Sequence, residues 1–290
     1  MNVISGFPID GSYEYIKKLF SSRCTHIIGN LIIYGLHPSP NGTEPDLGFL
    51  KSIEEISGFL IIMNSSIREI PFSSLKVIRG LGGGYKIHED LPPATLLIRH
   101  NYDSNRILYR INFDQLKAIE NGDVYMFDNP VGCDLVGGLV FKNLFTNPAE
   151  QRFHNSLDLD LPILNSTLNE PCQSSNPGAL LASNGGRCQK RSCDWCFQMP
   201  DQGPEREEYC CHPSCLGGCT GPQESDCFAC KNFYDGEKCV ESCPKPTTVQ
   251  HYRLTLNVRF KYEFNGFCVN ECPGNEIALN FVKFSNEFQP

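Results

Sequence analysis

The first 171 residues of this 290-residue chain contain only two cysteines, Cys24 and Cys133. The chain has no basic run and a formal net charge of −8, which argues against a nucleic-acid-binding surface. No apolar run approaches the roughly 20 residues that a membrane-spanning helix needs. Residues 1–20 also lack the apolar segment of a secretory signal peptide. These features leave the class of protein open, and the cysteines after residue 171 are more informative.

Thirteen of the sixteen cysteines lie between Cys188 and Cys272, a stretch of 85 residues. This density predicts disulfides or bound metal, and disulfides indicate an oxidising compartment. Two Cys-x-x-Cys motifs, at 193–196 and 227–230, have the spacing of zinc ligands. Only two histidines lie among these thirteen cysteines. The crowding of the cysteines favours disulfides over zinc, and we expect neither metal nor cofactor.

Three Asn-x-Ser/Thr sequons agree with an exported protein. The predicted glycosylation sites are Asn41, Asn64 and Asn165.

Residues 1–150 read as a repeat of short strands and turns. Apolar, strand-like runs occupy residues 26–36, 58–64, 94–101 and 122–130. Between them LKSIEEI, LKVIRG and LKAIEN each begin Leu-Lys and place an isoleucine three residues after the leucine. The spacing is typical of stacked repeats. We expect a mostly β fold here, a leucine-rich-like right-handed β-helix or solenoid whose outward sheet face can bind a partner.

The composition changes after this region. Residues 151–187 read as a linker and a degenerate module, and residues 188–275 as a rod held by disulfides. Such a segment has too small an apolar core to fold by burial alone, and each disulfide typically contributes ~2–4 kcal/mol. Residues 276–290 form a tail without cysteine.

The run CCHPSCLGGCTGPQESDCFACKNFYDGEKCVESCP (210–244) resembles the furin-like cysteine-rich region of the epidermal growth factor receptor (ErbB) family. The insulin receptor family is a close second. CTHIIGNLIIYGL (24–36), FLKSIEEISGFLIIMNSSIREIPFSSLKVIRG (49–80) and FDNPVGC (127–133) resemble parts of the first receptor L domain of the same receptors. The resemblance implies an L domain truncated at its N-terminus, a non-family tail at 276–290, and a chain that is a fragment.

The resemblance also implies a disulfide pairing that spacing alone cannot give. It pairs Cys133 with Cys172, Cys188 with Cys196, Cys193 with Cys210, Cys211 with Cys219, Cys215 with Cys227, Cys230 with Cys239, and Cys243 with Cys268. Cys24 and Cys272 are left for cysteines outside this sequence.

The stretch between Cys243 and Cys268 has no cysteine and many aromatic residues. In the family it is a long β-hairpin, the dimerization arm, clamped at its base by one disulfide. The resemblance places Tyr252 at the arm tip, Lys261, Tyr262 and Phe264 on the return strand, and Phe233 in the site that receives a partner's arm. On the L domain it places the ligand-facing residues near Gly35, Asn64 and Arg99.

We therefore expect the extracellular ligand-binding and dimerization portion of a growth factor receptor tyrosine kinase. Its expected partners are a polypeptide growth factor and a second receptor chain, and this chain itself catalyses nothing. Its expected location is the extracellular face of the plasma membrane, attached through a segment absent here. Three alternatives stay open: a soluble decoy that sequesters a growth factor, an insulin-receptor-like ectodomain, and an intracellular zinc protein with reduced cysteines.

Overall fold

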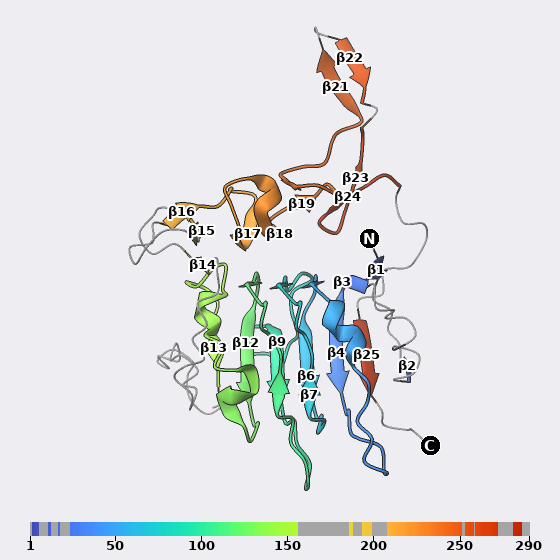
Figure 1. Ribbon diagram of the computed structural model, residues 1–290, viewed down its shortest axis with the longest axis vertical. Helices are drawn as coiled ribbons and strands as arrows, with labels where there is room; N and C mark the ends of the chain where they lie inside the picture. The colour runs from blue at the N-terminus through green and yellow to red at the C-terminus, as the bar shows by residue number, and fades with distance from the viewer. Residues whose placement is uncertain are drawn as a thin grey trace. The chain divides into compact units, whose positions relative to one another are not determined.

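The structure is a computed structural model (Figure 1). It describes residues 24–155, 193–198, 208–250, 253–257 and 259–271, with the short stretches 2–5, 11–12, 17, 186–187 and 281–285. The chain divides into two units, residues 1–181 with 278–290, and residues 182–277. Strands dominate both units, which confirms the mostly β prediction. The 3-10 helices of the described part are η1 (Gly48–Ser52), η2 (Gly132–Val136), η3 (Phe141–Asn143) and η5 (Glu224–Asp226).

The first unit contains three sheets in which all neighbouring strands are parallel. The first sheet runs β1 (Asn2–Ser5), β3 (Cys24–Ile28), β5 (Glu55–Ile56), β8 (Val77–Ile78) and β11 (Ala118–Ile119). The second runs β13 (Phe153–His154), β12 (Asp123–Phe127), β9 (Ala94–Arg99), β6 (Leu60–Met63), β4 (Asn30–Tyr34), β25 (Phe281–Ser285) and β2 (Gly11–Ser12). The third pairs β10 (Arg110–Ile111) with β7 (Glu69–Ile70). From β5 to β10 the chain visits the three sheets twice in the same order.

The Leu-Lys repeats supply the core between these sheets. Their leucines and isoleucines are all buried: Leu50, Leu75, Leu116, Ile53, Ile78 and Ile119. In the first sheet Ile78 pairs with Ile119 and with Ile56, which is also buried, so the isoleucine of the first repeat that stacks on the others is Ile56 rather than Ile53. The run at 26–36, which the sequence presents as one strand, is divided into β3 and β4 by Gly29, whose φ of 112° suits glycine.

Strands of the second sheet are apolar on both faces. In β6, Leu60 and Ile62 join the main core, while Ile61 joins a second apolar cluster with Leu97 and Tyr125. Burial on two faces explains why these strands read as continuous apolar runs. This second cluster, here called the outer cluster, lies on the sheet face that points away from the main core, here called the outer face.

The second unit is built from small sheets tied together by disulfides. One runs β14 (Gly186–Arg187), β15 (Trp195–Gln198) and β16 (Glu208–Cys210), and another pairs β17 (Cys215–Cys219) with β18 (Cys227–Cys230). A third runs β20 (Cys239–Val240), β19 (Phe233–Tyr234), β24 (Phe267–Val269) and β23 (Tyr262–Phe264), and the last pairs β21 (Thr247–Gln250) with β22 (Arg253–Leu256). No helix in the described part of the chain has the length and apolar character of a membrane span.

Candidate functional site

Four residues with left-handed backbone form a row where strands of the second sheet end. Gly35 (φ 64°), Asn64 (φ 50°), His100 (φ 52°) and Asp128 (φ 55°) each directly follow β4, β6, β9 or β12. A left-handed residue turns the chain sharply away from a strand, and asparagine and aspartate tolerate this conformation better than most residues. The row therefore marks the C-terminal edge of the outer face.

The structure brings the three predicted ligand-facing residues together along this edge. The amide of Gly35 donates to the carbonyl of Met63 at 3.1 Å, and the amide of Asn64 donates to that of Arg99 at 3.3 Å. Met63 and Arg99 are register partners in β6 and β9. Gly35 is buried, Asn64 half-buried and Arg99 exposed, so Arg99 offers the most side-chain surface.

Apolar side chains that the sequence did not single out share the outer face with Arg99: Met63 and Phe127 are its register partners, and Ile32 lies two strands away beside Ile61. Ile32, Met63 and Phe127 are partly buried and pack on the outer cluster. The guanidinium of Arg99 lies 5.1 Å from the centre of the Phe127 ring, a cation–π contact. We call Ile32, Met63, Arg99 and Phe127 the open patch. The continuous apolar runs in the sequence predict that these strands are buried on both faces. They do not show which end of the outer face is left without a covering segment.

The segment 81–93 covers the other end of the outer face. Ile87 and Leu91 pack on the outer cluster. The Tyr125 hydroxyl donates to the carbonyl of Pro92 at 2.8 Å, and the Tyr85 ring meets the Phe59 ring edge-on at 5.8 Å. This segment leaves the open patch as the accessible part of the face.

Charged groups line the edge next to the open patch. His100 Nδ1 lies 2.9 Å from Asp128 Oδ2, and the Tyr102 hydroxyl donates to Asp128 Oδ1 at 3.1 Å. The hydrogen bond with His100 lowers the pKa of Asp128, which keeps this carboxylate ionised. With Arg99 alongside, the edge presents charges of both signs.

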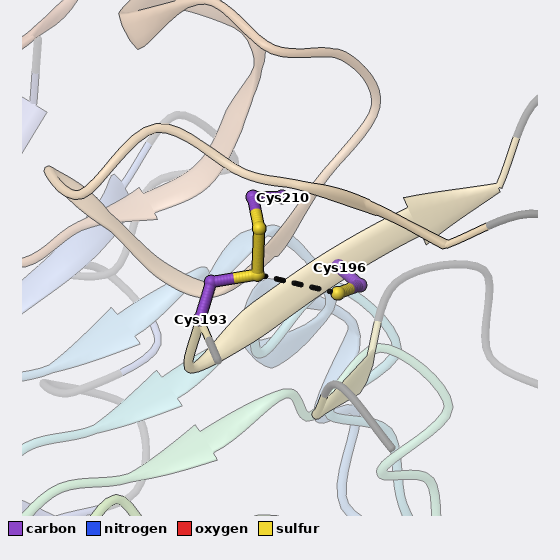
Figure 2. Close-up of side chains that lie close together, drawn as sticks. All are labelled: Cys193, Cys196 and Cys210. Carbon is purple, nitrogen blue, oxygen red and sulfur yellow. Dashed lines mark hydrogen bonds between the residues drawn. A yellow bond between two sulfur atoms is a disulfide. The ribbon is translucent and has the colours of Figure 1, made fainter. Parts of the chain in front are cut away.

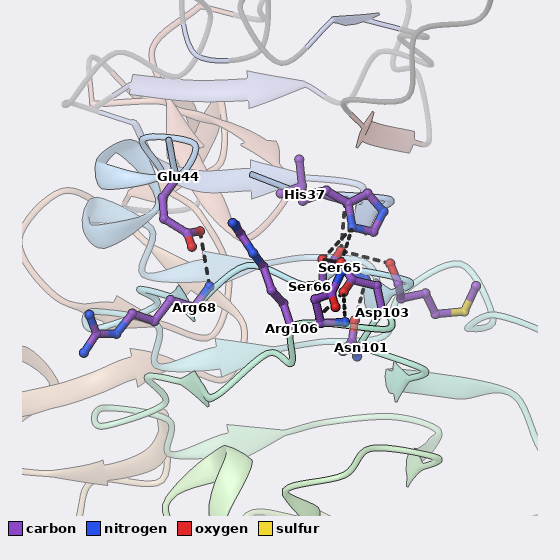
Figure 3. A network of polar contacts seen from close by, with 11 residues as sticks. His37, Glu44, Ser65, Ser66, Arg68, Asn101, Asp103 and Arg106 are labelled. Carbon is purple, nitrogen blue, oxygen red and sulfur yellow. Dashed lines mark hydrogen bonds and ion pairs between the residues drawn. The ribbon is translucent and has the colours of Figure 1, made fainter. Parts of the chain in front are cut away.

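Just after the edge row in the sequence, a serine, a histidine and an aspartate contact one another, but they do not form a hydrolytic triad (Figure 3). Ser66 Oγ donates to Asp103 Oδ2 at 2.6 Å and lies 2.7 Å from His37 Nδ1. In a triad the histidine stands between serine and carboxylate and takes the serine proton. Here the Ser66 hydroxyl is directed to the carboxylate, and Ser66 is only 1% exposed. The network therefore holds the turns together rather than activating a nucleophile.

The predicted glycosylation sites differ in surroundings. Asn41 is exposed in the loop after β4, where the Ser39 hydroxyl donates to its side-chain oxygen. Asn64 is half-buried in the edge row, and its sequon ends in the buried Ser66. Asn165 lies outside the described residues.

Five disulfides of the second unit have the pairing that the resemblance implies. They are Cys193–Cys210, Cys211–Cys219, Cys215–Cys227, Cys230–Cys239 and Cys243–Cys268. Cys196 is also disulfide-bonded. Cys172 and Cys188 lie outside the described residues, so the pairs Cys133–Cys172 and Cys188–Cys196 stay predictions. Cys24 is buried in the first unit, and Cys272 lies outside the described residues.

The sulfurs of three cysteines lie close together near β15 and β16, as Figure 2 shows. The sulfurs of Cys193, Cys196 and Cys210 all lie within 4.8 Å of one another, and those of Cys193 and Cys196 are 3.6 Å apart. Such a group could hold a metal only as thiolates. All three sulfurs are instead engaged in disulfides, so this cluster offers none to zinc.

In the stretch from Cys243 to Cys268 an outgoing and a returning segment pair with each other: the amide of Asn257 donates to the carbonyl of Pro246 at 2.8 Å, and that of Lys261 to the carbonyl of Pro244 at 3.1 Å. β21 pairs with β22 in antiparallel fashion over four register positions, from Thr247↔Leu256 to Gln250↔Arg253. The predicted tip residue Tyr252 follows β21 and precedes β22 in the sequence and lies outside the described residues. At the base, after Lys261, β23 pairs with β24 through a turn at Asn265-Gly266.

The other four predicted dimerization residues gather at the base of this stretch. Tyr262 and Phe264 lie on β23 and Phe233 on β19, and both strands belong to one sheet. Tyr262 is 43% exposed. Lys261 Nζ donates to the carbonyl of Asp235, which ties the stretch to the loop after β19. The register places Phe264 beside Phe267 and Phe267 beside Tyr234, so Phe264 and Tyr262 share a face with Tyr234, while Phe233 faces the other side of this sheet.

Two family models match these two parts of the chain. The receptor L domain matches residues 23–139, and the furin-like cysteine rich region matches residues 164–287. The second range includes most of the segment 276–290 that the sequence sets apart as a tail. The chain thus joins a receptor L domain to a furin-like cysteine-rich region, as the sequence predicts.

Curated relatives point to one receptor family. The chain is 28% identical to the epidermal growth factor receptor of Drosophila melanogaster over 277 residues, 92% of this chain and 18% of that protein. It is 30% identical to the human receptor tyrosine-protein kinase erbB-4 over 278 residues, 93% of this chain and 20% of that protein. A melanoma receptor tyrosine-protein kinase of Xiphophorus maculatus is 28% identical over 303 residues, 93% of this chain and 23% of that protein.

The chain spans about a fifth of the length of these relatives. The similarity confirms the predicted resemblance to the epidermal growth factor receptor family.

Proposed function

We propose that the first unit binds a polypeptide growth factor at the open patch. The observation that carries this proposal is the patch itself, where Met63 and Phe127 remain partly exposed beside Arg99, with Ile32 partly exposed on the same face. Exposed apolar side chains rimmed by polar groups are typical of protein-binding sites. The edge row of Gly35 and Asn64 supports the rim, and its backbone cannot move without disturbing β4 and β6.

The segment 81–93 supports the same site. Because Ile87 and Leu91 cover one end of the outer face, a ligand needs to fill only the remaining end. Arg99 is held over Phe127, so its charge is positioned before a ligand arrives. Aromatic residues and arginine are enriched among the residues that dominate binding energy.

Binding of purified epidermal growth factor to the secreted chain tests the site. Met63→Glu places a charge in the apolar part of the patch, and we expect affinity to fall about tenfold or more. Tyr109→Glu is the matched control, because Tyr109 is 63% exposed but precedes β10 in the third sheet. Equal losses for both variants, or none for Met63→Glu, would contradict the proposal.

The second unit is proposed to pair with a second receptor chain through the stretch 243–268. The hairpin β21–β22 and the aromatic base around Tyr262 support this role. Growth factor binding is proposed to favour the form in which this surface is available, a population shift. Tyr252→Ala should abolish growth-factor-dependent association measured by analytical ultracentrifugation, while Tyr109→Ala should not. Association unchanged by Tyr252→Ala would refute the arm assignment.

Further proposals concern the architecture and the complete protein. The recurring order of the three parallel sheets supports a leucine-rich-like right-handed β-helix, or solenoid, for the L domain. The second unit, with its five described disulfides, would extend as a rod. The disulfides and the relatives support an extracellular location and a receptor tyrosine kinase as the complete protein. This chain would bind and associate, while the kinase activity would belong to the rest of that protein.

A further inference from the structure

One disulfide of the second unit differs from the others in exposure. Cys210 is exposed and Cys193 half-buried, whereas every other described disulfide has at least one buried cysteine. A disulfide is opened by a thiolate that reaches one of its sulfurs, so access decides which bond reacts first. Among the described disulfides, Cys193–Cys210 is therefore the one that an incoming thiolate reaches most easily.

A cavity leads to one sulfur of this bond. It has a volume of about 210 Å³ and is lined by Cys193 and Trp195, with Asp194, His212 and Lys231 as its charged or titratable groups. Cys210 does not line it, whereas Cys211 and Cys215 of two other disulfides do. Because Cys211 is 7% and Cys215 2% exposed while Cys193 is half-buried, a nucleophile in the cavity meets Cys193 first. Lys231 attracts an anionic thiolate and Asp194 repels it, which makes the rate of attack sensitive to both charges.

We infer that Cys193–Cys210 is a site of reversible thiol–disulfide exchange with small acidic thiols such as glutathione. The thiolate sulfur attacks the sulfur of Cys193 and forms a mixed disulfide with it. The Cys193–Cys210 bond breaks, and its electron pair stays on the sulfur of Cys210, which takes a proton from water. No further oxidant or reductant is needed for this step.

The local fold survives the opening of this bond. Cys210 stays in β16, whose backbone pairs with β15 at Cys196↔Cys210, Phe197↔Tyr209 and Gln198↔Glu208. The rings of Phe197 and Tyr209 also contact each other, with centres 5.7 Å apart. The two sulfurs therefore remain close enough for the bond to form again when the thiol leaves.

The experiment exposes the whole chain to limiting reduced glutathione at neutral pH, traps thiols with iodoacetamide and identifies the modified peptides by mass spectrometry. We expect glutathione on Cys193 and alkylation of Cys210 before any of the other four described disulfides opens. Lys231→Gln should slow the reaction about threefold and Asp194→Asn should speed it by a similar factor. Lys245→Gln, an exposed lysine of the same unit outside the cavity, should leave the rate unchanged.

Two results would overturn the inference. One is that another described disulfide opens first in the unmodified chain. The other is that neither Lys231→Gln nor Asp194→Asn changes the rate at Cys193. Both variants alter exposed or cavity-lining side chains, so correct folding can be checked by the remaining disulfide map.

Discussion

The guanidinium of Arg79 donates to Glu55 in a bidentate contact, with Nε 2.6 Å from Oε1 and Nη2 3.1 Å from Oε2. A third hydrogen bond runs from Nη1 to Glu120 Oε2 at 2.7 Å. Burial alone would lower the pKa of Arg79, but the two carboxylates raise it above its ordinary value. The group joins the ends of β5, β8 and β11 in the first sheet.

Replacing Arg79 should lower the free energy of unfolding more than replacing an exposed arginine does. Arg79→Met leaves the carboxylate of Glu55, whose side chain is 10% exposed, without its cation. Breaking a buried pair in this way destabilises by about 3 kcal/mol. Urea unfolding followed by circular dichroism should show this loss. Arg110→Met, at an arginine whose side chain is 57% exposed, should change stability by less than about 0.5 kcal/mol.

The disulfide at the base of the proposed arm should matter for association and not for growth factor binding. Cys243–Cys268 spans 25 residues and closes the stretch that contains β21 and β22. Replacing both cysteines by alanine removes a constraint worth about 3 kcal/mol. We expect dimerization by ultracentrifugation to be lost while epidermal growth factor binds within about twofold of the unmodified chain. Loss of both activities would show that the two units are not independent.

The first sheet should make stability depend on pH. Burial lowers the pKa of His26, and the nearby Glu55 and Glu54 only partly offset this. In the unfolded chain the pKa of histidine is about 6.5, so below that value the unfolded state binds more protons than the folded state. Stability should therefore fall as the pH decreases through about 6.5 and level off below the folded-state pKa.

His26→Gln should remove this component of the pH dependence. As the pH decreases, the urea midpoint of the unmodified chain should fall more steeply than that of His26→Gln, because only the unmodified chain loses the contribution of a neutral His26. The two midpoints should therefore converge or cross. His88→Gln is the control, since the side chain of His88 is 49% exposed. Parallel pH profiles for His26→Gln and the unmodified chain would contradict the assignment.

Glycosylation can be tested at the two described sequons. Asn41 is exposed, whereas Asn64 lies in the edge row beside Met63 of the open patch. A glycan on Asn64 would crowd the proposed growth factor site, so we expect Asn41 to carry a glycan and Asn64 none. Peptide mass spectrometry of the chain secreted from insect cells decides this. A fully occupied Asn64 in a chain that still binds growth factor would exclude the open patch.

Much of the first unit could be predicted because its repeats encode its core. Leu50 with Ile53, Leu75 with Ile78 and Leu116 with Ile119 are buried pairs, and their constant spacing predicted stacked layers before any pairing was known. The charged Arg79 gave no such signal. Its burial depends on Glu55 and Glu120, which only the pairing of separate strands brings to it.

The surroundings of the predicted site residues could not be read from the sequence. The resemblance pointed to Gly35, Asn64 and Arg99, yet the apolar side chains that remain partly exposed on the same face are Ile32, Met63 and Phe127. Sequence patterns predict that a strand is apolar on both faces. They do not show how the segment 81–93 folds back, because that depends on contacts such as Tyr125 with Pro92.

Hydrogen–deuterium exchange of the secreted chain, with and without epidermal growth factor, tests the central claim most directly. Binding at the open patch should slow exchange in the C-terminal halves of β4, β6, β9 and β12, and leave β7 and β10 unchanged. Protection that is absent from these four strands, or confined to β7 and β10, would contradict growth factor binding at the outer face.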